Sequence, residues 1–156
     1  MFKQTSIFLF CKGEKIFMKL YDLVKIYPIF DRFALAQYSN FVVALEIAKL
    51  KKAIQEKIEF YNEQEMKLAK TYGEKDKDGN LIVKNGSQIR FKSIEDGRKF
   101  NELVLKLRET EIDFGKPIKI DLHKDIVKDN FVLAPNDILA VEELIEVDAN
   151  DEYKDA

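Results

Sequence analysis

Apolar residues recur at helical spacing over a long central stretch of the chain, from Phe41 to Tyr72. This period predicts one amphipathic helix, which Ser39 or Asn40 would cap and Gly73 would end. At about 1.5 Å per residue, such a helix is roughly 50 Å long, which exceeds the diameter of a small domain. Other elements must therefore run beside it. Its inner stripe consists of Ile47, Leu50, Ile54, Ile58, Tyr61, Leu68 and Tyr72.

Two shorter stretches also have helical spacing. Residues 19–36 contain Pro28, which removes an amide donor, so we expect two short helices there or one helix after an extended segment. Near the other end, Pro135 suits the first position of a helix over about residues 135–146. In the second stretch, Ile138, Val141, Leu144 and Ile145 are expected to face inward.

A β-hairpin is predicted over residues 81–91. Two β-prone runs, 81–84 and 87–91, flank Asn85–Gly86. An Asn-Gly pair in this setting favours a type I′ turn, because both turn residues then need a positive φ. Farther along, residues 118–122 alternate between apolar and polar, as a half-buried strand does.

A further helix is predicted over about residues 94–110. Ser93 and Asp96 form the capping-box pattern that opens it. It is the natural antiparallel partner of the long helix. The fold class is therefore α+β: a long antiparallel helical hairpin with a β-hairpin inserted at its tip, one or two further short strands and a C-terminal helix. Its inner face consists of Phe100, Leu103, Val104 and Leu107.

The 156 residues suit a single domain, which we place over residues 18–147. Residues 148–156 form an acidic tail. Residues 1–17 form a leader with two interpretations. One is a genuine flexible or β-strand N-terminus that starts at Met1. The other is untranslated sequence before a start at Met18, since Lys12-Gly13-Glu14 is what the purine-rich, ribosome-binding string AAA-GGA-GAA would encode.

The composition excludes several classes of chemistry. Hydrophobic residues make up 46 % of the chain, enough for a core, and the net charge of −2 argues against a generic polyanion binder. With one cysteine, Cys11, and one histidine, His123, the chain can form neither an internal disulfide nor a Cys/His zinc cluster. No apolar run approaches the roughly 20 residues of a membrane-spanning helix.

No motif points to a catalytic or cofactor site. The chain lacks a Gly-Lys-Ser/Thr phosphate loop and a Gly-x-Ser-x-Gly nucleophile elbow. Asp76, Asp78 and Asn80 match three positions of an EF-hand loop, but its glycine and final glutamate are missing. His123 is expected to be a surface residue at a strand end. We therefore expect no enzyme activity, no catalytic residue, no cofactor and no bound metal.

Two groups of basic residues are the only features typical of a nucleic-acid surface. Phe91 and Phe100 lie among the second group, where they could stack on bases. However, the long helix also carries many glutamates, and mixed charge is more typical of a solvated face or an oligomer seam. Nucleic acid is thus the less favoured partner. The basic residues are Lys49, Lys51 and Lys52, and then Arg90, Lys92, Arg98 and Lys99.

Six short motifs follow one another along the chain in an order that is typical of one protein family. They are Lys25–Pro28, Ala69–Gly73, Glu74–Asn80, Phe100–Leu103, Ile118–Ile120 and Leu133–Leu139. From about Met18 to Val147 the chain resembles a family of small proteins, a domain of unknown function, in tailed phages and prophages of low-GC Gram-positive bacteria. The resemblance implies a phage origin and action in the cytoplasm of an infected or lysogenic host cell. It transfers no catalytic residues.

The function expected is a non-enzymatic protein-interaction module. The long helical hairpin would oligomerise or bind a phage or host protein, as an assembly accessory or as a host- or defence-modulating protein. The alternative is a weak nucleic-acid-binding accessory protein. The residues expected to form the protein contact are Ile47, Leu50, Ile54, Ile58, Tyr61, Leu68, Phe100, Leu103 and Leu107.

Overall fold

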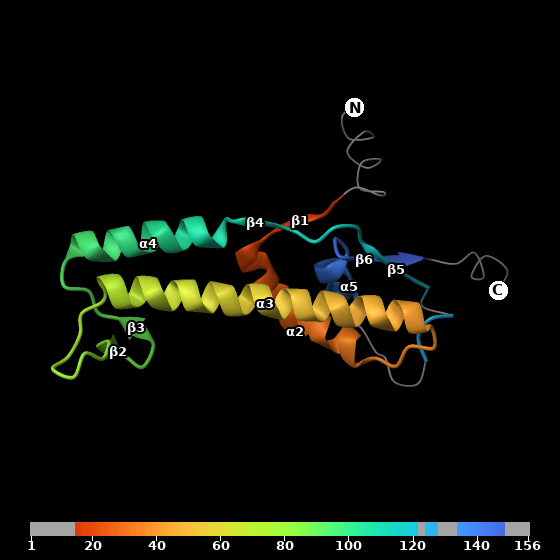
Figure 1. Cartoon of the computed structure of the whole chain (residues 1–156), viewed down its shortest axis with the longest axis horizontal. Helices are drawn as coiled ribbons and strands as arrows, with labels where there is room; N and C mark the ends of the chain where they lie inside the picture. Colours follow the sequence, from red (N-terminus) through yellow and green to blue (C-terminus); the bar gives the residue numbers. More distant parts are fainter. Residues whose placement is uncertain (1–14, 122–123, 128–133, 149–156) are drawn as a thin grey trace, which may run out of the picture.

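Four helices and three two-stranded sheets form the part of the chain that the computed structural model describes, residues 15–121, 124–127 and 134–148. The architecture is α+β, which confirms the predicted fold class. Figure 1 shows an elongated molecule with one long helix as its spine. The elements are β1 (Phe17–Lys19), α2 (Leu20–Leu35), α3 (Phe41–Tyr72), β2 (Val83–Lys84), β3 (Gln88–Ile89), α4 (Ile94–Arg108), β4 (Glu111–Asp113), β5 (Ile118–Asp121), α5 (Pro135–Val141) and β6 (Ile145–Asp148).

The spine, α3, has the predicted bounds and the predicted cap. The side-chain oxygen of Asn40 accepts hydrogen bonds from the amides of Val42 and Val43, at 3.1 and 3.5 Å. Two helices cover this long helix, one after the other. Helix α2 packs on its first half, and α4 runs antiparallel along its second half (Figure 1). The helical hairpin of α3 and α4 is thus present, with the β2–β3 hairpin at its tip.

Helix α2 continues through Pro28 as a single helix. The division into two helices that we predicted at this proline is therefore wrong, and the single helix follows the extended strand β1. Apolar residues on both sides of the proline are fully buried, Leu20 and Leu23 before it and Phe30 and Phe33 after it. Their burial contributes several kcal/mol, enough to offset the roughly 3 kcal/mol that an internal proline costs.

The turn of the β-hairpin confirms the Asn-Gly prediction, since φ is 51° at Asn85 and 78° at Gly86. Gly73 does end α3, but its φ of −71° is not left-handed. A Cβ at this position would lie 2.5 Å from the carbonyl oxygen of Ala69 and 2.5 Å from a methyl of Leu81. Glycine is therefore required here because the last turn of α3 and the Leu81 side chain leave no room for a Cβ.

The described residues pack into two separate apolar clusters along α3. The larger cluster joins α2 and the first half of α3 to β5, β6 and α5. The smaller one lies at the far end, where Ala69, Phe100 and Val104 pack with the hairpin, and the rings of Phe91 and Phe100 are 5.2 Å apart. Each half of the long helix thus buries its stripe against a different set of elements.

Polar contacts hold the end of α4 against the larger cluster. Arg108 donates from Nε to the hydroxyl of Tyr61 at 2.9 Å, and its guanidinium lies 4.6 Å from the ring centre of Tyr21. Burial of the Tyr61 phenol raises its pKa. The end of α4 is therefore held against the middle of α3.

The C-terminal region corrects two predictions. The last helix ends at Val141 instead of continuing to residue 146, and residues 145–148 form β6, which pairs in parallel with β5. Helix α5 does begin with Pro135, as predicted. The described residues contain four strands outside the hairpin, β1, β4, β5 and β6, where one or two were expected. The apolar run around Ile145 fits both a helix and a strand, and pairing with the buried β5 decides between them.

Both predicted domain boundaries fall inside strands. Strand β1 includes Phe17, one residue before Met18, and pairs antiparallel with β4. Strand β6 includes Asp148, at the start of the predicted tail. Cys11, His123 and most of the predicted leader and tail lie outside the described residues, so what we inferred about them stays a prediction.

Candidate interaction surfaces

The apolar stripe that was expected to contact a partner lies inside the chain's own core. Ile47, Ile54 and Tyr61 are at most 4 % exposed, and Phe100 is 8 % exposed. These side chains stabilise the chain itself and present no surface to a second protein, which corrects the sequence-based expectation. The rest of the predicted set is partly buried: Leu50, Ile58, Leu68, Leu103 and Leu107.

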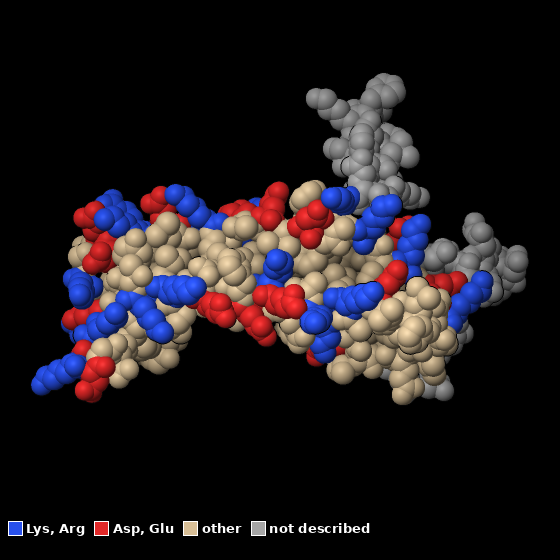
Figure 2. Space-filling model, in the orientation of Figure 1, with Lys and Arg blue, Asp and Glu red and all other residues tan. Residues whose placement is uncertain are grey.

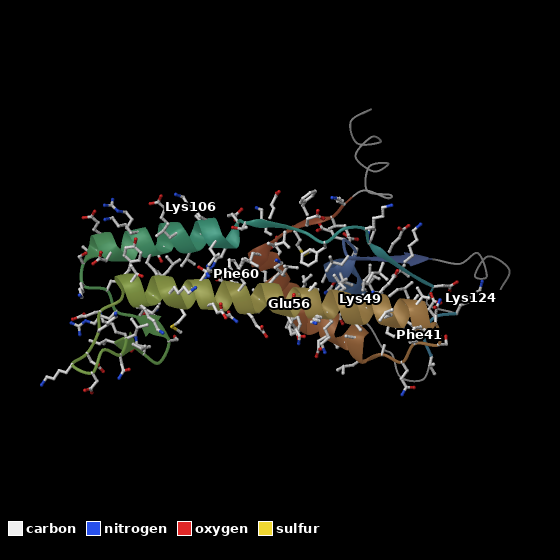
Figure 3. The ribbon with its side chains drawn as sticks, viewed as in Figure 1. Phe41, Lys49, Glu56, Phe60, Lys106 and Lys124 are labelled. Atoms are coloured by element: carbon white, nitrogen blue, oxygen red, sulfur yellow. The ribbon has the colours of Figure 1, made fainter. Side chains whose placement is uncertain are left out.

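A cluster of exposed apolar side chains lies instead where α2 turns into α3. Leu35 ends α2, and Phe41, Val42 and Leu45 share one face at the start of α3, because residues three and four apart are neighbours on a helix. They are 72, 78, 61 and 42 % exposed, in that order, and we call them the turn patch. Figure 2 shows an uncharged surface over this end of the molecule, where Figure 3 labels Phe41.

Hydrogen bonds fix the backbone beneath the turn patch. The hydroxyl of Tyr38 donates to the carbonyl of Phe33 at 2.7 Å, and burial raises the pKa of Tyr38 to about 12, so this donor stays protonated at neutral pH. The Ser39 amide donates to the carbonyl of Asp125 at 2.9 Å, and the Asn40 side chain donates to the Asp125 carboxylate at 3.0 Å. The patch is therefore presented in a defined geometry.

A second surface feature is a groove of about 410 Å³ between α3 and the segment that joins β4 to β5. Three lysines, Lys49, Lys57 and Lys116, line it together with the acidic residues Glu46 and Asp113. We call it the lysine groove. Its floor is apolar and is formed by segments that lie far apart in the sequence: Ile16, Leu50, Ala53, Phe114, Ile118 and Leu144.

The basic residues proposed for nucleic-acid contact do not form one surface. Lys49, Lys51 and Lys52 lie on the first half of α3, whereas Arg90, Lys92, Arg98 and Lys99 lie at the far end, around the hairpin and α4.

Several of these basic side chains are also neutralised by ion pairs. Lys51 lies 2.7 Å from Asp31, and this hydrogen bond raises the pKa of the lysine. Arg90 lies 2.9 Å from Glu74. Lys99 lies 3.4 Å from Glu95.

Two further observations on the described residues concern metal binding and membrane-spanning helices. Within them, no group of three or more His, Cys, Asp or Glu side chains is arranged to hold a metal ion. In the stretch that partly resembles an EF-hand, the Asp76 carboxylate accepts from the amides of Asp78 and Asn80, both at 2.9 Å, and so closes a turn. None of the helices in these ranges combines the length and the apolar character needed to span a membrane.

Sequence reasoning missed both surfaces, for different physical reasons. Phe41, Val42 and Leu45 lie off the apolar stripe, and three large apolar residues off the stripe in the first turns of a helix are a signal that the pattern did contain. The sequence pattern contains no comparable signal for the lysine groove. Lys57 and Lys116 become neighbours of one groove only through the fold, since distant segments form its two walls.

Comparisons of the chain with protein-family models, curated proteins and solved structures gave no match. The resemblance to phage and prophage proteins therefore stays a prediction. Any argument about function has to start from the surfaces of the chain itself.

Proposed function

We propose that this protein is a non-enzymatic protein-interaction module that binds its partner through the turn patch. The observation that carries this proposal is the presence of four large apolar side chains, 42 to 78 % exposed, on the two sides of one turn whose backbone is held by hydrogen bonds. Full burial of such a side chain is worth about 1.5–3 kcal/mol, so the exposed parts of all four would supply roughly 4–8 kcal/mol before the costs of association. Clusters of this kind mark protein contacts more often than scattered apolar residues do.

The resemblance to phage and prophage proteins supports a finer form of the proposal. In that form the module acts in the cytoplasm of an infected or lysogenic host cell, as an assembly accessory or a host- or defence-modulating protein. Its partner is a second copy of the chain, a phage protein or a host protein. The position of the gene among structural or early genes separates the two roles.

The substitution Phe41→Glu tests the patch without endangering the fold. It replaces the most exposed patch residue at the first position of α3, where the first turn holds no acidic residue. A carboxylate at a helix N-terminus interacts favourably with the helix dipole. Ile94→Glu is the matched control, because Ile94 is an apolar residue at the first position of α4 and is 94 % exposed.

Two measurements follow from this pair. Size-exclusion chromatography with light scattering reports self-association, and affinity capture from infected cells reports other protein partners. We expect wild type and Ile94→Glu to form the same dimer or capture the same protein, and Phe41→Glu to lose it. A chain that stays monomeric and captures no partner, or a Phe41→Glu variant that behaves like wild type, contradicts the proposal.

The alternative, weak nucleic-acid binding, has one observation in its favour. A hollow of about 520 Å³ at the hairpin exit is lined by Lys84, Arg90, Phe91 and Lys92, which combines positive charge with an aromatic ring. A gel shift with single-stranded nucleic acid at low salt tests it. Binding that weakens with salt and with Lys92→Glu supports this alternative, and the absence of a shift at low salt removes it.

A further inference from the structure

The lysine groove combines positive charge with an apolar floor. Lys49, Lys57 and Lys116 form no ion pair within the residues that the structure describes. Asp113, one of the two acidic lining residues, is paired with Lys15 at 3.5 Å. Glu46 is then the one lining carboxylate without such a pair among the described residues. The groove therefore carries an excess of positive charge that a negatively charged ligand would complement.

The spacing of the lysines sets the kind of anion. Lys49 and Lys57 are eight residues apart on α3, so their backbone positions are separated by about 12 Å along the helix axis. Two residues that are four positions apart in an extended peptide are separated by roughly 13 Å. A ligand with several carboxylates along an extended chain can thus reach both lysines. A single-headed amphiphile such as a fatty acid pairs with one lysine and leaves two unpaired.

The walls of the groove favour recognition through side chains. The amides of Phe114, Gly115 and Ile118 already donate within the chain, at 2.9, 2.8 and 2.9 Å, and Pro117 has no amide hydrogen. A bound strand would find no free backbone donor at these four positions. Contacts must therefore come from the long lysine side chains on the rim and from apolar residues on the floor. Figure 3 marks Lys49 on the first half of α3, below the segment that joins β4 to β5.

We propose that the lysine groove binds an extended segment of a partner protein in which acidic and apolar residues alternate. Its carboxylates pair with Lys49, Lys57 and Lys116, and its apolar side chains lie on the floor beside Leu50 and Ala53. None of the turn-patch residues lines this groove, so the proposal stands or falls separately from the proposed function.

Fluorescence anisotropy with defined peptides tests the groove in the full chain. The probe is a fluorescein-labelled peptide of alternating aspartate and leucine, and its counterparts replace aspartate by asparagine or by lysine. The double variant Lys49→Glu/Lys57→Glu reverses two rim charges. Its matched control, Lys52→Glu/Lys67→Glu, makes the same change in net charge with exposed α3 residues that do not line the groove.

We expect the aspartate peptide to bind the wild type and the control double variant alike, and at least about tenfold more weakly to the groove double variant. Binding should weaken as salt is raised. Ala53→Leu fills the floor without changing charge and should also weaken binding severalfold, which separates docking in the groove from general charge attraction. Circular dichroism confirms that each variant is folded.

Three results overturn the proposal: equal loss of binding in the groove and control variants, equal binding of the lysine peptide, or binding unaffected by Ala53→Leu. Decanoate serves as the competing probe. If decanoate binds with dependence on Lys49 and Lys57 while the aspartate peptide does not bind, the groove takes a small amphiphilic acid and the peptide proposal is wrong.

Discussion

Asp137 is expected to contribute to the free energy of unfolding, because its buried carboxylate links α5 to α2. It is 8 % exposed, and its two oxygens lie 2.8 and 3.0 Å from the guanidinium of Arg32. It also accepts from the amide of Ala134 at 3.3 Å, at the start of α5. Removing this side chain therefore breaks an ion pair between helices and a helix cap together.

The magnitude follows from these three contacts. A two-point pair between arginine and carboxylate is stronger than a neutral hydrogen bond, but the Arg32 side chain is 51 % exposed, so solvent screening lowers its worth to about 1 kcal/mol. Loss of the cap costs a further 1 kcal/mol or so. Together with lost packing, we expect Asp137→Ala to lower the free energy of unfolding by about 2–3 kcal/mol.

A double-mutant cycle in urea isolates the ion pair. Arg32→Ala, Asp137→Ala and the double variant are unfolded under identical conditions, and the coupling energy is taken from the four free energies. We expect a coupling of about 1 kcal/mol. Additive effects, with a coupling below about 0.3 kcal/mol, would show that Asp137 acts through the cap and packing alone and would refute the role of Arg32.

Three further predictions concern the core, the end of α3 and pH. Ile54→Ala empties a fully buried position and should cost about 3–4 kcal/mol in urea unfolding. Gly73→Ala should cost about 1–3 kcal/mol, because its Cβ meets the Ala69 carbonyl. At Gly79 nothing lies within 4 Å of the added carbon, but its φ of 79° strains any side chain, so Gly79→Ala should cost about 1 kcal/mol. The folded-state pKa of Tyr38, about 12, lies above the usual 10.0, so its contribution to stability is complete below pH 10 and is lost as pH rises towards 12. Urea midpoints measured against pH should show this loss in the wild type and not in Tyr38→Phe.

The sequence predicted elements best where a local signal sufficed. Asn40 caps α3 and Ser93 caps α4, since a side-chain oxygen needs to reach amides only two or three residues away. The turn at Asn85–Gly86 has the expected positive φ values for the same local reason. At Gly73 the helix end was predicted correctly but the reason was not, because φ at Gly73 is −71° and glycine is needed for the lack of space around its Cα.

Features that depend on distant partners could not be predicted. Nothing within residues 145–148 shows that β5 will offer them an edge for parallel pairing, so the helical spacing of Val141 and Leu144 was extended too far. Burial of the α3 stripe also depends on residues that are distant in the sequence. A stripe that packs inside one chain and a stripe that forms an oligomer look alike in sequence, and only the position of α2 and α4 separates them.

The covering of α3 in turn limits the surface that the helix offers to a partner. Because α2 and α4 each cover half of the helix, most of its apolar stripe is buried within the described residues, and Leu50 is the stripe residue that also lines the lysine groove. What remains exposed are side chains beside the stripe: Phe41 and Leu45 at the open end, then Lys49 and Lys57 along the groove. The two surfaces differ in chemistry, one apolar and one basic over an apolar floor. A partner that covers the first should therefore bind with little dependence on salt, whereas a partner in the second should be displaced by it.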